Sequence, residues 1–111
     1  MVTRTQLLQE LVTLSRKPSA ILDELAAFGW DSSEELVVLR TDHLRSVLER
    51  YLGGVLPREA VEEWANAVEV RDDLGCDPRL SAIVDELANP ILHRPLSPDR
   101  AMELLSTLSP G

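Results

Sequence analysis

The side chains of this chain that could carry out chemistry are its carboxylates, two histidines and one cysteine. Paired carboxylates can act as general acid and base in glycoside hydrolysis, but that reaction needs a cleft, which a small Leu-rich chain seldom forms. His43 and His93 have no Glu or second His at metal-binding spacing, and Cys76 has no His close by in the sequence. The sequence therefore predicts no catalytic residues, no metal ligands, no cofactor and no enzymatic activity.

Two further segments share only their composition with known binding loops. The acidic residues 72–77 lack the alternating ligands and the closing Glu of a calcium loop. Gly53 and Gly54 are not followed by the Lys-Ser/Thr pair that completes a phosphate-binding loop. Neither segment predicts an ion or nucleotide site.

Length and composition indicate one small helical domain spanning residues 1–111. The chain has 111 residues, of which 44% are hydrophobic and only 4% aromatic, so Leu, Val, Ile and Ala must build the core. A single cysteine rules out an intrachain disulfide. Because no apolar run has the length of a signal peptide or a membrane span, we expect a cytoplasmic protein.

The charge distribution opposes two classes of partner. The formal net charge is -8, and residues 18–39 and 59–86 together carry -12, so the remainder carries +4. Nucleic-acid binding depends on cations that neutralise phosphates, and binding to an anionic membrane surface has the same requirement. We therefore expect a partner that is neither nucleic acid nor membrane.

Apolar residues recur at helical spacing along nearly the whole chain, which predicts an all-α, compact bundle of about five to seven short helices. Capping residues and prolines place them at residues 3–14, 19–28, 31–39, 41–52, 57–70, 77–88 and 97–108. Thr3 with Gln6 forms a capping box, and Ser19 and Thr41 are expected N-caps. The run Leu36–Leu39 could instead be extended, and no segment has the pattern of a hairpin.

Residues 57–70 carry the most unusual pattern of charge. The spacing of Val61, Trp64 and Val68 predicts a buried face, with Trp64 in the core. Glutamates on the opposite face have no cation four residues ahead, and two like-charged pairs at that spacing each cost the helix roughly 0.2–0.5 kcal/mol. Such a face either keeps a Leu-rich protein soluble or attracts a basic partner. The face comprises Glu59, Glu62, Glu63, Asn66, Glu69 and Asp73.

Residues 51–64 (YLGGVLPREAVEEW) resemble the helix, glycine turn and acidic helix of small bacterial immunity proteins of the colicin D type. The resemblance covers the middle third of the chain and does not extend to residues 88–97. It implies an acidic helical inhibitor that docks carboxylates against the cations of a toxin nuclease. Which carboxylates dock follows from charge, because no positions are matched one by one.

The sequence thus predicts a non-enzymatic interaction module whose acidic face binds a basic protein. Asp23, Glu24, Asp31, Glu34 and Glu35 would extend this face if their helices pack beside residues 57–70. Trp30 lies at a helix junction, where it either closes the end of the core or anchors a partner. The alternative function is a homo-oligomeric scaffold or regulatory subunit, in which helices bury apolar faces across a two-fold axis of a homodimer.

Overall fold

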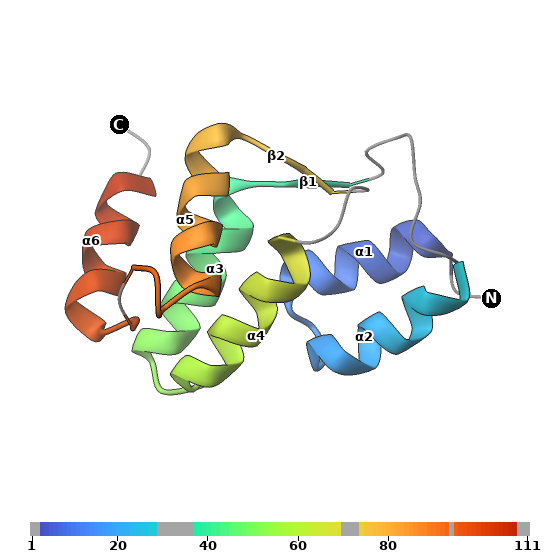
Figure 1. Ribbon diagram of the computed structural model, residues 1–111, viewed down its shortest axis with the longest axis horizontal. Coiled ribbons are helices and arrows are strands. Elements are labelled where there is room, and N and C mark those ends of the chain that lie inside the picture. The colour runs from blue at the N-terminus through green and yellow to red at the C-terminus, as the bar shows by residue number, and fades with distance from the viewer. Residues whose placement is uncertain (1–2, 29–36, 70–73, 94, 109–111) are drawn as a thin grey trace.

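The computed structural model describes residues 3–28, 37–69, 74–93 and 95–108 of the chain. The described residues form six α-helices, one short 3-10 helix and two short strands (Figure 1). The helices are α1 (Arg4–Thr13), α2 (Pro18–Leu25), η1 (Ala26–Phe28), α3 (Thr41–Leu52), α4 (Arg58–Glu69), α5 (Pro78–Ala88) and α6 (Pro98–Leu108). The strands are β1 (Val37–Leu39) and β2 (Leu74–Cys76). The predicted all-α class is confirmed, with one small sheet added.

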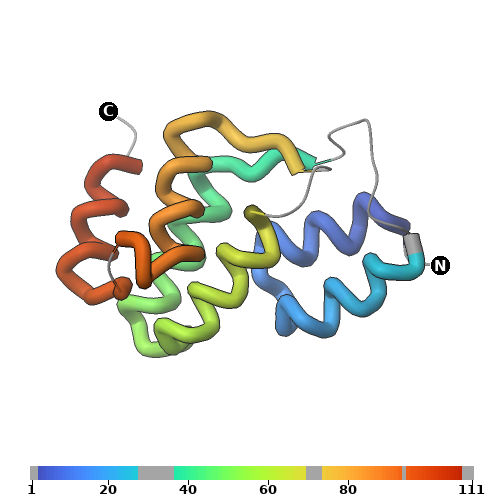
Figure 2. The backbone as a smooth tube through the Cα atoms, viewed as in Figure 1, coloured from blue at the N-terminus to red at the C-terminus, as the bar shows by residue number. Residues whose placement is uncertain are grey.

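The helices pack around α4, which lies between an N-terminal helix pair and a C-terminal group. Figures 1 and 2 show α1 and α2 at one end of the molecule and α6 at the other, with α6 beside α3. α4 packs against α5 most extensively and also contacts α1, α2 and α3. The buried side chains of all six α-helices join in one hydrophobic core. The position of α4 therefore depends on both halves of the chain.

The sheet corrects the expectation for residues 31–39. Val37–Leu39 is extended rather than helical, so the helix expected to reach Leu39 is wrong and the extended alternative is confirmed. β1 pairs in parallel with β2, with Val37 opposite Leu74 and Leu39 opposite Cys76. Burial alternates along β1, because Val37 and Leu39 face the core while Val38 is exposed. Residues 31–36, the first part of that expected helix, lie outside the described residues.

Most helix boundaries follow the capping residues, with two corrections. The Thr3–Gln6 capping box is present, and the Asp77 side chain accepts from the backbone N–H of Arg79 at 2.8 Å. α2 begins at Pro18, one residue before the expected cap, because proline is well suited to the first helical position. Thr41 is itself helical, and the cap position belongs to Arg40.

His43 takes over the capping of α3. Its Nδ1 accepts a hydrogen bond from the backbone N–H of Arg40 at 2.9 Å, which requires an unprotonated Nδ1. Partial burial and then the nearby charge of Arg40 lower the pKa of His43 from its ordinary value of 6.5. The fold therefore favours the neutral ring.

The C-terminal end of α1 is held by side chains that are distant in sequence. The indole N–H of Trp64, which is fully buried, donates to the carbonyl oxygen of Leu11 at 2.7 Å. Arg50 of α3 donates to the carbonyls of Thr13 and Leu14 at 2.7 and 3.0 Å. Leu14 adopts a left-handed conformation with φ 51°, which costs a non-glycine residue roughly 1 kcal/mol. These bonds and the burial of Leu14 offset that cost.

We expect Trp64→Phe to lower the free energy of unfolding by about 1–3 kcal/mol, because it removes the indole donor and part of the buried ring. Urea unfolding followed by circular dichroism measures the change. Unaltered stability would show that the bond to Leu11 does not hold α4 against α1.

The neutral His43 predicts that stability depends on pH. Because the pKa of His43 is lower in the folded protein, the unfolded chain protonates this ring first as the pH falls. The stabilisation from the neutral ring is therefore complete above the pKa of the unfolded state, and it is lost as the pH falls through the pKa of the folded state. We expect His43→Gln, which keeps an acceptor, to reduce the loss of stability between about pH 7.5 and about pH 5.5. An identical loss in both proteins would contradict this role of His43.

Candidate functional site

α4 presents its carboxylates to solvent because its apolar face is fixed in the core. Val61, Trp64 and Val68 are buried as the sequence predicted. Glu59, Glu63 and Glu69 are exposed and Glu62 is half-buried. α4 is therefore an amphipathic helix, with one face in the core and the acidic face exposed to solvent.

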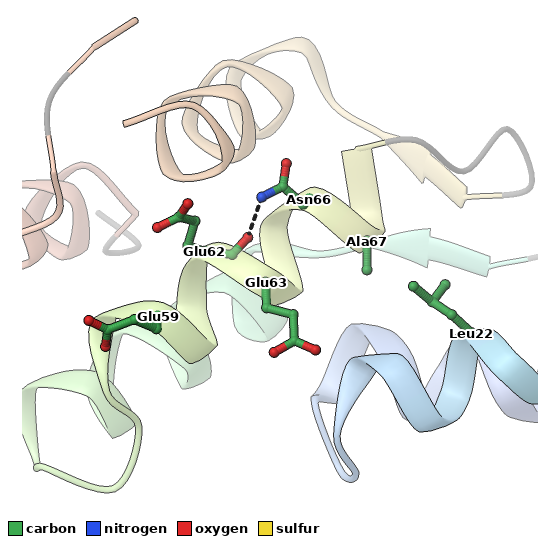
Figure 3. A pocket seen from close by; sticks show the side chains of 6 residues that line it. All are labelled: Leu22, Glu59, Glu62, Glu63, Asn66 and Ala67. Atoms are coloured by element: carbon green, nitrogen blue, oxygen red, sulfur yellow. Dashed lines mark hydrogen bonds between the residues drawn. The ribbon is translucent and has the colours of Figure 1, made fainter. Parts of the chain in front are cut away.

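A shallow groove of about 450 Å³ runs along the junction of α4 and α2, and we call it the acidic groove. It is lined by Leu22, Glu59, Glu62, Glu63, Asn66 and Ala67. Figure 3 shows Glu63 and Ala67 on the side of α4 that faces Leu22, with Glu62 and Asn66 along the opposite side. The apolar groups Ala67 and Leu22 thus lie together at one end of the groove, next to carboxylates that all come from α4.

The carboxylates of α4 are poorly neutralised compared with those of other helices. Within the described part of the chain, the carboxylates of Glu62 and Glu63 make no ion pair or hydrogen bond, and Glu59 lies 3.8 Å from its exposed neighbour Arg58. By contrast, Arg16 bridges Glu10 and Glu24 at 2.6 Å each. The negative electrostatic potential of the α4 carboxylates therefore extends into the solvent.

Asn66 and Glu69 each make a polar contact within the described residues. The amide nitrogen of Asn66 donates to the backbone carbonyl of Glu62 at 3.0 Å, which leaves its side-chain oxygen facing outward as an acceptor. A Glu69 oxygen lies 3.4 Å from the amide nitrogen of Asn89, at the end of α5. The acidic face of α4 therefore continues towards the C-terminal end of α5.

The structure brings together most, but not all, of the predicted site. Glu59, Glu62, Glu63 and Asn66 share the groove. Of the two segments that the extended face required beside α4, α2 packs there. Asp23 of α2 is exposed, whereas Glu24 is occupied by Arg16. Asp73 and Trp30, together with Asp31, Glu34 and Glu35, lie outside the described residues. The sequence missed Leu22 and Ala67 as lining residues, because only the packing of α2 against α4 brings Leu22 beside this helix.

Cys76 and His93, which the sequence analysis considered as catalytic or metal-binding residues, have the following surroundings. Partial desolvation and then the charge of Asp77 raise the pKa of the Cys76 thiol, which favours its protonated form. The His93 ring nitrogen Nε2 lies 2.9 Å from an Asp85 oxygen. Among residues 3–28, 37–69, 74–93 and 95–108, no group of three His, Cys, Asp or Glu side chains could hold a metal ion. Nor does any described helix combine the length and the apolar character that crossing a membrane requires.

Comparisons of the chain with protein-family models, with curated proteins and with solved structures found no match.

Because Glu59 and Glu63 place like charges one turn apart, we expect Glu63→Lys to raise the free energy of unfolding by roughly 0.2–0.5 kcal/mol or more. Urea unfolding at low ionic strength measures the change, and the gain should shrink in high salt. A loss of stability would mean that Glu63 makes a favourable contact in the free protein, which would remove the argument that the acidic groove opposes its own helix.

Proposed function

We propose that this chain is a non-enzymatic interaction module whose acidic groove binds a basic protein. The observation that carries the proposal is the unneutralised state of Glu62 and Glu63, within the described residues, on a helix whose other face is fixed in the core. Sequences break local stability rules most often where a surface has a function. A basic partner would supply the cations that α4 lacks.

Inhibition of a toxin nuclease, in the manner of the acidic immunity proteins that residues 51–64 resemble, is the form of this function that we favour. A nuclease must present cations to bind phosphates, so a surface complementary to it is acidic. Leu22 and Ala67 give the groove apolar surface, which would add contact area beside the charged pairs. Electrostatic attraction would accelerate association and make it sensitive to salt.

The test is a pull-down from host lysate in about 50 mM and about 500 mM salt, with variants of equal net charge. In one variant, Glu59, Glu62, Glu63 and Glu69 are changed to Gln. In the control, four exposed acids outside α4 (Asp42, Glu49, Asp99 and Glu103) are changed to their amides. Either set moves the formal charge from -8 to -4.

We expect wild type and control to capture the same basic protein in low salt, and the α4 variant to capture at least about tenfold less. Nuclease activity of the captured protein, with and without the chain, then tests inhibition. Equal capture by the α4 variant, or equal loss in both variants, would contradict the proposal, because recognition would then not depend on α4.

A further inference from the structure

The turn that follows α5 exposes two large aliphatic side chains next to each other. Ile91 is 97% exposed and Leu92 is 78% exposed, the highest values among the large hydrophobic residues described. Neither joins the core cluster. We call these two residues the apolar turn. Neither side chain contributes to the packing of the hydrophobic core.

The apolar turn is nevertheless braced by hydrogen bonds at its base. The backbone N–H groups of Leu92 and His93 both donate to the carbonyl of Asn89 at 3.1 Å. The His93 ring lies 2.9 Å from Asp85, and the Asn89 amide donates to the same carboxylate at 2.9 Å. A contact surface that is ordered before binding loses less conformational entropy when a partner arrives. The turn therefore exposes both aliphatic side chains before any partner binds.

The apolar turn also lies close to the acidic face of α4. Asn89, which anchors the turn, is the residue whose amide lies 3.4 Å from Glu69. Figure 3 shows Glu62 and Asn66 on the side of α4 that faces away from Leu22. Glu69 comes three residues after Asn66, about one turn further along the helix. The apolar turn therefore begins two residues after a direct contact with the Glu69 carboxylate, at the junction of α4 and α5.

We propose that the apolar turn is the anchor of the partner-binding surface and receives the apolar side of a basic, amphipathic segment of another protein. This inference rests on the proposed function and extends the interface from the acidic groove across α4 to an apolar contact on the side that faces away from Leu22. The cations of that segment would meet Glu62 and Glu69, while its aliphatic side chains would cover Ile91 and Leu92. Binding energy at protein interfaces is concentrated in a few such desolvated anchors, surrounded by polar contacts. Charge alone would give attraction without a fixed orientation.

The test uses two synthetic helical peptides of equal positive charge. One has an arginine face and a leucine face, and in the other serine replaces every leucine. Binding is measured by fluorescence anisotropy for wild type and for the double variant Ile91→Ser/Leu92→Ser. Because both residues are exposed, this variant should unfold in urea like wild type. The control double variant, Val38→Thr/Met102→Ser, changes two residues on β1 and α6 that are 51% and 53% exposed.

We expect the arginine–leucine peptide to bind wild type and the control equally, and to bind the Ile91→Ser/Leu92→Ser variant at least about tenfold more weakly. The arginine–serine peptide should bind all three proteins equally and weakly. Equal binding of the arginine–leucine peptide to the serine variant, or no binding to wild type, would overturn the inference. Light scattering that finds a wild-type dimer abolished in the serine variant would also overturn it, because a second copy would then cover the turn.

The variant with four Gln substitutions in α4 separates this inference from the proposed function. If it binds the arginine–leucine peptide as tightly as wild type does, the acidic face is not a recognition surface and both proposals fail. If it loses binding while the Ile91→Ser/Leu92→Ser variant does not, the proposed function stands and the apolar turn is not its anchor.

Discussion

The hydrogen bond from the Trp64 indole to the Leu11 carbonyl determines how α4 is oriented in this structure. A buried indole N–H must find an acceptor, and the one it finds belongs to the last full turn of α1. Once Trp64 is held in this way, the remaining apolar residues of α4 face the core as well, and its glutamates face solvent. Arg50 strengthens the same junction from α3, so three helices meet at the end of α1. The acidic surface is thus a consequence of a packing constraint.

This chain neutralises carboxylates elsewhere. Arg100 forms a two-point contact with Glu86 at 2.6 and 2.7 Å, joining α6 to α5, and Arg16 joins α1 to α2 through two glutamates. The described residues give no comparable arginine to Glu62 or Glu63. Like charges at helical spacing oppose α4, although burial of Trp64 and its neighbours outweighs a cost of roughly 0.2–0.5 kcal/mol per pair. The proposed basic partner would turn this unfavourable arrangement into a binding surface.

The sequence predicted the features that depend on neighbouring residues, namely helix starts and the buried faces of helices. Asp77-Pro78 and Ser97-Pro98 mark the starts of α5 and α6, and the spacing of Val61, Trp64 and Val68 identified the buried face of α4. The pairing of β1 with β2 could not be predicted, because it joins three-residue segments far apart in sequence and each is too short to show alternation. The sequence also could not predict that Leu22 lines the groove or that Ile91 and Leu92 are exposed. Tertiary contacts decide which aliphatic side chains are covered.

The central claim is that carboxylates of α4 meet cations of a basic partner, and zero-length cross-linking of carboxylates to amines tests it most directly. A carbodiimide added to a low-salt lysate joins only groups already in contact, and mass spectrometry then identifies the joined residues. Our account predicts cross-links from Glu59, Glu62, Glu63 or Glu69 to lysines of one basic protein. Cross-links that instead involve exposed acids such as Asp42, Glu49 or Glu103, or no cross-linked partner, would contradict it.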